Sequence, residues 1–358
     1  MNYKSIRFYL FLLLWIISFI IVGCLGLKTT KLSLDDVTIT STVTPNPTPT
    51  RYIITISIST ETAEVPITEA SIDYKKHILK NRIDFGEIPP GVYLLYTDWK
   101  SSDNIYGVNI ETNEEVFFSE YMFSYSNNKN FTSYRTDDRN LMILNLNTED
   151  EEEIEFNLQC YERSWSPDDK YLAVNCEDQI YVINTEDFGV QQLTSSIHPV
   201  VDSYQNPMWS PDGKWIATTY HDLMSLNSTE ENGIYLIDSD CINQSIQCKQ
   251  NMVGPFFPYS IHAEYSWSPD SERIVTYLNN AIQVVNIDTN ESTRLIDKVF
   301  DIGGLNWSPD GDWIFFSQFF FGIENTINIY KIPAQGGEPI LVAEDKGFIS
   351  TVIEVSSQ

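Results

Sequence analysis

The side chains best suited to catalysis or metal binding are sparse in this sequence. Its histidines are His77, His198, His221 and His262. The last three lie in successive parts of the second half, and with a carboxylate they could hold a divalent metal. The alternative is a set of isolated loop histidines. There is no Gly-x-Ser-x-Gly nucleophile elbow and no glycine-rich phosphate loop, so we expect no catalytic residue, metal site or cofactor.

Acidic side chains offer a second kind of site. Four aspartates stand where loops are expected: Asp238, Asp240, Asp288 and Asp310. Their oxygens could bind calcium, but aspartate is also an ordinary residue of tight turns, which is the interpretation we favour. The acidic run 149–153 separates two expected strands. We expect a solvated loop there, the alternative being a contact with calcium or a basic partner.

The cysteines indicate an oxidising compartment. Apart from Cys24, they form an even set of four, Cys160, Cys176, Cys241 and Cys248. The first two flank a turn, where they could face each other across a hairpin, and the last two flank a short loop. We predict disulfides at both places, with buried free thiols as the alternative. No pair has the spacing of a zinc site with histidine.

The N-terminus resembles a bacterial lipoprotein signal. Lys4 and Arg7 precede an apolar run over 8–22, and Gly23 stands immediately before Cys24. The resemblance implies a signal peptide over 1–23, cleavage before Cys24 and a lipid on its sulfur. The alternative is an uncleaved membrane anchor. Both interpretations place the rest of the chain outside the cytoplasm, in the cell envelope.

A tether is expected next, over 24–87. Residues 38–50 are rich in Thr, Ser and Pro, a composition that cannot bury a core. A short helix could form at 72–81. The folded domain is expected over 88–358.

A sequence repeat predicts the strands and turns that would position any site. Trp-Ser-Pro-Asp occurs four times, with spacings of 44, 58 and 40 residues. Its residues are Trp165, Pro167 and Asp168, then Trp209, Pro211, Asp212 and Gly213, then Trp267, Pro269 and Asp270, then Trp307, Pro309, Asp310 and Gly311. Apolar runs flank each copy, which predicts strand, tight turn, strand. A period of about 40–45 residues with several short strands is typical of β-propeller blades.

Each residue of the motif has a physical role in a hairpin. Proline has the φ that the first turn position requires, aspartate accepts backbone hydrogen bonds, and glycine supplies a left-handed residue. We expect the tryptophan ring to be buried between blades. Asp169 and Ser271 replace the glycine in two copies. Serine adopts a positive φ less readily, so we expect a distorted turn at Ser271.

The Trp-Ser-Pro-Asp-Gly turn, followed by strands such as Ile234 to Asp238, resembles the repeat of TolB-like β-propellers. The resemblance covers roughly 88–358 and implies the fold alone, since such repeats occur in proteins of many functions. Some TolB-like propellers are lyases that hold a metal with a histidine cluster. The histidines of this chain could therefore converge at the channel mouth.

The blade count follows from two atypical ends. A degenerate repeat begins at Tyr125, and Gly91 to Tyr96 is a second strand with no first strand before it. Ser350 to Val355 has the pattern of a first strand with nothing after it. We predict an all-β, six-bladed propeller closed by the C-terminal strand, because closure removes free sheet edges. The alternatives are a frayed tail, or a seventh blade hidden between residues 209 and 267.

Charge and aromatic residues bear on partners. The formal net charge of −28 opposes binding to nucleic acid or anionic lipid. We predict a binding or scaffold module, anchored to the membrane by lipid, whose partner is a protein or small ligand at one face of the ring. Candidate contacts are Phe256, Phe257, Tyr259, Phe319, Phe320 and Phe321, unless they pack against neighbouring blades. The alternative is an enzyme that acts on sugars or peptides at the channel mouth.

Overall fold

The computed structural model describes residues 73–80, 88–97, 104–119, 124–136, 140–154, 158–195, 202–222, 232–244, 248, 250–254, 264–321 and 325–355. The expected signal peptide, Cys24 and the Thr/Ser/Pro-rich part of the tether lie outside these ranges. Residues Ser71–Gln358 form one compact unit. No helix in the described ranges is both long and apolar enough to span a bilayer.

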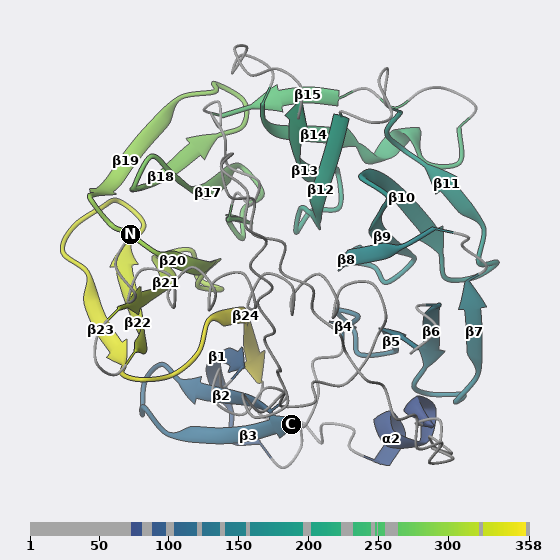
Figure 1. The fold of residues 1–358 in the computed structure, drawn as a ribbon, viewed down its shortest axis with the longest axis horizontal. Helices are drawn as coiled ribbons and strands as arrows, with labels where there is room; N and C mark the ends of the chain where they lie inside the picture. Colours follow the sequence, from purple (N-terminus) through teal and green to yellow (C-terminus); the bar gives the residue numbers. More distant parts are fainter. Residues whose placement is uncertain are drawn as a thin grey trace, which may run out of the picture. The chain divides into compact units, whose positions relative to one another are not determined.

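The described strands form six antiparallel sheets of four strands each, arranged round a ring (Figure 1). This confirms the predicted six-bladed β-propeller. We number the blades from the one that contains β1. In each blade the first strand of the sheet lies toward the middle of the ring and the fourth lies at its outer edge (Figure 1).

The first three blades contain the N-terminal half of the unit. Blade 1 contains β24 (Ile349–Val355), β1 (Gly91–Thr97), β2 (Ile105–Asn109) and β3 (Glu115–Ser119). Blade 2 contains β4 (Ser124–Tyr125), β5 (Phe131–Arg135), β6 (Leu141–Asn145) and β7 (Glu151–Ile154). Blade 3 contains β8 (Cys160–Trp165), β9 (Tyr171–Cys176), β10 (Gln179–Asn184) and β11 (Val190–Gln192).

The other three blades continue round the ring. Blade 4 contains β12 (Asp202–Trp209), β13 (Trp215–Asp222), β14 (Gly233–Asp238) and β15 (Gln250–Val253), with the 3₁₀ helix η2 (Ser239–Cys241) before β15. Blade 5 contains β16 (Tyr265–Trp267), β17 (Arg273–Leu278), β18 (Ala281–Asn286) and β19 (Ser292–Asp297). Blade 6 contains β20 (Ile302–Trp307), β21 (Trp313–Phe320), β22 (Thr326–Pro333) and β23 (Ile340–Ala343).

The C-terminal strand closes the ring, as predicted. β24 pairs antiparallel with β1, and Leu94 lies opposite Val352. Ile349 is 3% exposed and packs with Leu94 of blade 1 and Phe315 of blade 6. Where the two blades meet, Gly304 has a φ of +64°, and a Cβ there would lie 2.3 Å from the carbonyl oxygen of Ile349. Glycine is therefore required at this contact.

The four motif tryptophans are buried between blades, as predicted. Their side chains are 5–7% exposed. The Trp165 ring stacks on Phe131 of blade 2 with centroids 6.0 Å apart, and the Trp209 ring stacks on Tyr171 of blade 3 at 6.2 Å. These two rings thus pack against the preceding blade with the large apolar surface that an indole provides.

The motif turn is a small hydrogen-bonded unit. In blade 4, Ser210 Oγ donates to Asp212 Oδ1 at 2.6 Å and accepts from the amide of Trp215 at 3.0 Å. The amide of Lys214 donates to the same Asp212 oxygen at 3.1 Å. Serine and aspartate are therefore needed together, because the hydroxyl joins the carboxylate to the start of the second strand.

The turn at Ser271 is not distorted, so that prediction was wrong. Ser271 has a φ of 62°, and its amide donates to the Ser268 carbonyl at 2.9 Å. The amide of Gly213 makes the equivalent bond to Ser210, also at 2.9 Å. Ser271 Oγ also accepts the amide of Asp212 in the preceding blade at 3.0 Å, and this bond offsets part of the cost of the positive φ.

Two other segments refine the sequence predictions. The acidic run is not a loop throughout, since residues from Glu151 onward form β7, the outer strand of blade 2. Its glutamates are tolerated because the strand lies at the outer edge of the blade: Glu152 and Glu153 are exposed, and only Ile154, at 4% exposure, is buried. The predicted short helix is α2 (Tyr74–Lys80). It lies within the expected tether, and its buried Ile78 packs against residues of blade 2.

Candidate functional site

The two faces of the ring differ in the kind of connection they carry. The Trp-Ser-Pro-Asp turns join first to second strands at one face, which we call the turn face. At the opposite face, the link face, hairpins join second to third strands and links join successive blades. A pocket lies at the link face, where blades 3 and 4 meet near the middle of the ring.

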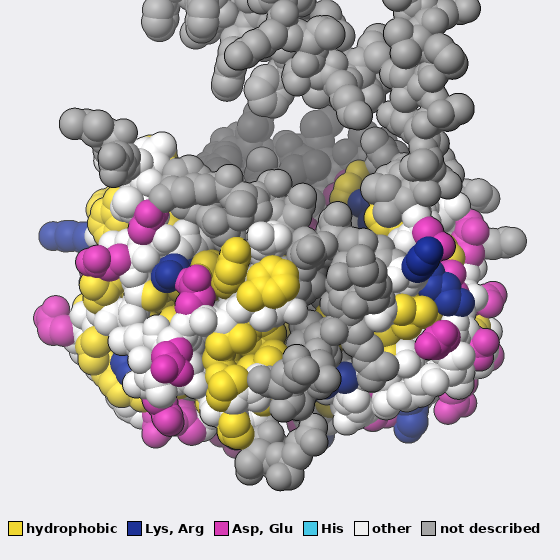
Figure 2. Space-filling view, turned by 90° about the horizontal axis from the view of Figure 1, so that it is seen from below, with side chains coloured by type: hydrophobic (Ala, Val, Ile, Leu, Met, Phe, Trp, Pro, Cys, Tyr) yellow, Lys and Arg dark blue, Asp and Glu magenta, His cyan; other side chains and the backbone are white. Residues whose placement is uncertain are grey.

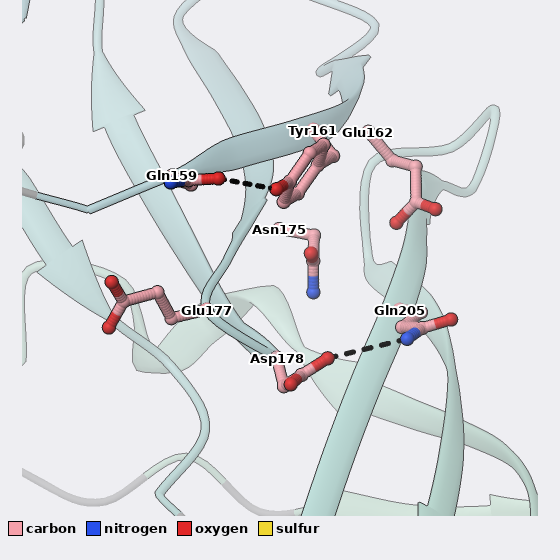
Figure 3. Close-up of a pocket in the computed structure, with 7 residues that line it drawn as sticks. All are labelled: Gln159, Tyr161, Glu162, Asn175, Glu177, Asp178 and Gln205. Atoms are coloured by element: carbon pink, nitrogen blue, oxygen red, sulfur yellow. Dashed lines mark hydrogen bonds between the residues drawn. The ribbon is translucent and has the colours of Figure 1, made fainter. Parts of the chain in front are cut away.

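The pocket has a volume of about 410 Å³, and every residue that lines it carries a polar group on its side chain. It is lined by Gln159, Tyr161, Glu162, Asn175, Glu177, Asp178 and Gln205. Figure 3 shows the Asn175 amide lying between Tyr161 and Asp178, and the Glu177 carboxylate directed away from them. The Tyr161 side chain is 53% exposed, so its ring is available to a ligand.

Two irregular strands direct these side chains. The pairing of β8 with β9 shifts register between Cys160 and Arg163, and that of β12 with β13 shifts between Gln205 and Met208. Such bulges change the direction of a side chain and are frequent beside functional sites. The first irregularity includes Tyr161 and Glu162, which both line the pocket, and the second begins directly after Gln205, a third pocket residue.

A disulfide lies directly beside the pocket. Cys160 and Cys176 are joined with an S–S distance of 2.07 Å, and a second disulfide joins Cys241 to Cys248 at 2.13 Å. The residues on both sides of Cys160, and on both sides of Cys176, line the pocket. The first disulfide therefore links the two strand ends that carry most of the pocket.

Two of the three carboxylates of the pocket, Asp178 and Glu162, are held by hydrogen bonds from blade 4. Asp178 Oδ1 accepts from Ser203 Oγ at 2.8 Å and from Gln205 Nε2 at 3.3 Å (Figure 3). Glu162 accepts from the amide of Asn206 at 2.8 Å. Bonds to ionised carboxylates are stronger than neutral ones, so they fix the positions of both groups.

The charge of Glu162 acts on a buried neighbour. Tyr265 donates hydrogen bonds to the carbonyls of Asn206 and Ala217. Burial raises the pKa of Tyr265 well above its ordinary value, and the nearby Glu162 carboxylate raises it further. Tyr265 therefore stays neutral at physiological pH and keeps its proton for hydrogen bonding to these carbonyls.

Among the described residues, the histidine and aspartate candidates from the sequence are not among those that line the pocket. His221 lies on β13 and is 4% exposed, whereas His198 and His262 lie outside the described residues. No group of three or more His, Cys, Asp or Glu in the described ranges could hold a metal ion. The loop aspartates serve turns there: Asp238 accepts the amide of Asp240 at 3.0 Å, and Asp310 accepts that of Asp312 at 3.0 Å.

Some of the aromatic candidates lie outside the described residues, and the others lie in blade 6. Phe256, Phe257 and Tyr259 lie outside the described residues. Phe320 and Phe321, at the link-face end of β21, are 39% and 75% exposed. The rings of Phe319 and Phe321 are 4.4 Å apart, and Phe320 lies 6.5 Å from Tyr330 in the same blade. These contacts are local to blade 6, which lies elsewhere in the ring from the pocket (Figure 1).

Sequence reasoning missed every residue that lines the pocket. They come from three separate stretches of chain, and none belongs to a recognisable motif. Two signals were present: the predicted cysteine pair, whose neighbours form the walls, and the polar residues at strand ends. The excess of acid does not mark the place, since acidic and basic side chains are interspersed over the described surface in Figure 2.

No protein-family model matches the chain, and no curated protein matches its sequence. TolB from Acinetobacter baumannii matches in structure with a TM-score of 0.51 and 14% identity, over 74% of this chain and 66% of that protein, just under two thirds of its length. A TolB-like protein from Agrobacterium tumefaciens matches with a TM-score of 0.46 and 16% identity, over 73% and 92% of the two chains. An oligogalacturonate lyase from Vibrio parahaemolyticus matches with a TM-score of 0.47 and 15% identity, over 70% and 74%. The Acinetobacter match shows a common TolB-like propeller fold and, at this identity, the fold alone.

Proposed function

We propose that this chain is an extracytoplasmic, lipid-anchored β-propeller that binds a polar ligand, a protein segment or a small molecule, in the link-face pocket of blades 3 and 4. One observation carries the proposal: a cavity of about 410 Å³ in which side chains from two blades converge beside an exposed tyrosine. Pockets with a few fixed polar groups and an aromatic surface are typical of ligand sites.

The chemistry of the walls favours binding. Glu162 and Asp178 are fixed by donors from blade 4, and Tyr161 offers an aromatic surface with a hydroxyl that donates to Gln159 at 2.6 Å. Side chains held in this way need little reordering when a ligand binds, which lowers the entropic cost of association. Carboxylate and amide groups recognise hydroxyl, amide or amine donors, so the ligand is expected to be rich in such donors.

Variants of the pocket test this proposal in intact cells. Affinity capture with the full chain should recover a ligand or partner with the wild type and not with Tyr161→Ser or Glu162→Gln. Phe117→Ser is a matched control, because Phe117 is 51% exposed but lies on β3 of blade 1. Equal recovery with all four proteins would show that the pocket is not the binding site.

The proposed anchor rests on the N-terminal pattern that ends at Cys24, and the two disulfides fit an oxidising compartment. Metabolic labelling with a fatty acid should mark the wild type and not Cys24→Ala. Equal labelling would count against lipidation and leave the pocket proposal intact.

A further inference from the structure

Two arginines point into the same space between blades 2 and 3. Arg135 ends β5, and alternation places it on the face of that strand that carries Phe131. Arg163 lies on β8, on the face that carries Trp165. The Phe131 and Trp165 rings stack with centroids 6.0 Å apart, so these two faces are opposed. The Arg135 guanidinium also lies 5.2 Å from the ring centroid of Tyr161, a pocket residue.

These arginines are partly buried, and each has one buried nitrogen without a hydrogen-bond partner. Within the described ranges, Arg163 Nη1 and Arg135 Nε are buried and have no hydrogen-bond partner. The same holds for Ser133 Oγ, which alternation places on the same face of β5 as Arg135. The ion pairs found among the described residues involve other basic residues, such as Arg294 with Asp297 at 2.9 Å in blade 5.

The surroundings of Arg163 lower the pKa of its guanidinium group. Burial, and then the positive charge of Arg135, lower the pKa of Arg163 to about 10. Arg163 is therefore still charged at neutral pH, and the charge of Arg135 repels it. Leaving a buried guanidinium nitrogen unpaired is costly, and a bound anion that accepts a hydrogen bond from it removes that cost. Guanidinium groups present paired donors that match the two oxygens of a carboxylate.

We propose that Ser133, Arg135 and Arg163 form a subsite for a carboxylate group of the ligand. This inference rests on the proposed function, because Tyr161 both lines the pocket and contacts Arg135. A monovalent anion fits better than a divalent one, since Glu162, Glu177 and Asp178 line the adjoining pocket and repel additional negative charge. The ligand then places a carboxylate between blades 2 and 3 and its donor groups in the pocket.

The subsite can be tested on the full chain with acetate as the carboxylate probe. Thermal unfolding is followed at constant ionic strength, with acetamide as the neutral analogue and inorganic phosphate as the second anion. With acetate at about ten times its dissociation constant, mass action predicts a rise in Tm of roughly 3 °C. Acetamide should give no rise, and phosphate should give a smaller one.

Single-residue variants then show which side chains are responsible for the rise in Tm with acetate. Arg163→Met and Arg135→Met should abolish the response to acetate, and Ser133→Ala, a smaller change, should reduce it. Arg294→Met is the matched control, because Arg294 is exposed and lies on β19 of blade 5. It should respond like the wild type.

Three results would overturn the subsite. They are an equal response to acetate in Arg163→Met and the wild type, no difference between acetate and acetamide in the wild type, and a larger response to phosphate than to acetate. If the ligand captured by the pocket also binds Arg163→Met unchanged but fails to bind Tyr161→Ser, the carboxylate subsite is wrong and the pocket proposal stands. Binding that survives Tyr161→Ser contradicts the pocket instead.

Discussion

Single residues at the turn face connect neighbouring blades where the motif departs from its consensus. Asp169, which replaces glycine, accepts a hydrogen bond from Ser126 Oγ at 2.8 Å and one from the amide of Asn128 at 3.1 Å, both in blade 2. Ser271, the other replacement, accepts the amide of Asp212 in blade 4. Both residues have a positive φ, and in return each supplies an acceptor that glycine lacks.

Replacing Asp169 with glycine isolates this contribution. Asp169→Gly keeps the positive φ accessible but leaves Ser126 Oγ without its acceptor, so we expect a loss of about 1–2 kcal/mol in the free energy of unfolding. Asp169→Asn keeps one acceptor and should lose less. Urea denaturation measures both. A glycine variant as stable as the wild type would show that the bond between the turns contributes nothing to stability.

The pairing of Arg135 with Arg163 is a feature that could not be predicted from the sequence. A net charge of −28 argues against binding of polyanions, but it is an average over the chain. Arg135 and Arg163 belong to different blades, and only the packing of β5 against β8 brings them together. Neither belongs to a motif, so no pattern in the sequence marks the pair.

Among the elements, the motif turns carry a titratable contribution to stability. The hydroxyl of Ser308 and the amide of Asp312 donate to Asp310, and these bonds lower the pKa of Asp310. Because the pKa in the folded state is below that of the unfolded chain, the ionised aspartate stabilises the fold at pH above about 4. This stabilisation is lost as the pH falls through the folded-state pKa.

Removing the carboxylate should therefore matter at neutral pH and not in acid. We expect the difference in unfolding free energy between the wild type and Asp310→Asn to shrink as the pH falls from 7 to 3. Ser308→Ala removes the donor and should behave in the same way. Urea denaturation across this range tests the assignment, and a difference that stays constant with pH would contradict it.

The hairpin of β8 and β9 owes part of its rigidity to the disulfide beside the pocket. Cys160 and Cys176 are separated by 16 residues, so replacing both with alanine should cost about 3 kcal/mol by loop entropy. The same change should weaken ligand binding, because the neighbours of both cysteines line the pocket.

The second disulfide supplies the control. Cys241 and Cys248 are separated by 7 residues and contribute none of the pocket lining. Their double alanine variant should lose less stability and keep full binding. If both double variants bind the ligand equally well, the first disulfide does not shape the pocket.

The elements that could be predicted were those next to turns with characteristic residues such as Pro, Asp and Gly. The positions of the motif turns, of the strands around them and of the degenerate blade at Tyr125 follow from local patterns and were confirmed. The acidic strand β7 was missed because an outer strand has one solvated face and tolerates charge. The pocket could not be predicted, since two bulges and contacts between blades create it.

At the scale of the whole molecule, closure by the C-terminal strand completes blade 1. Ile349→Ala should cost about 2–4 kcal/mol, because this side chain is 3% exposed and packs against blades 1 and 6. Thr351→Ala, at an exposed position of the same strand, should change stability by no more than about 0.5 kcal/mol. Thermal or urea unfolding compares the two. A neutral effect at Ile349 would mean that β24 is not part of the stable ring.

We propose above all that a ligand binds at the link face, between blades 3 and 4. Hydrogen exchange of the full chain, measured with and without the ligand or partner recovered by capture, tests it most directly. We predict slower exchange in the segments around Tyr161, Asp178 and Gln205, with the Trp-Ser-Pro-Asp turns unchanged. Slower exchange at those turns, with none at the pocket segments, would place binding on the opposite face and contradict the account.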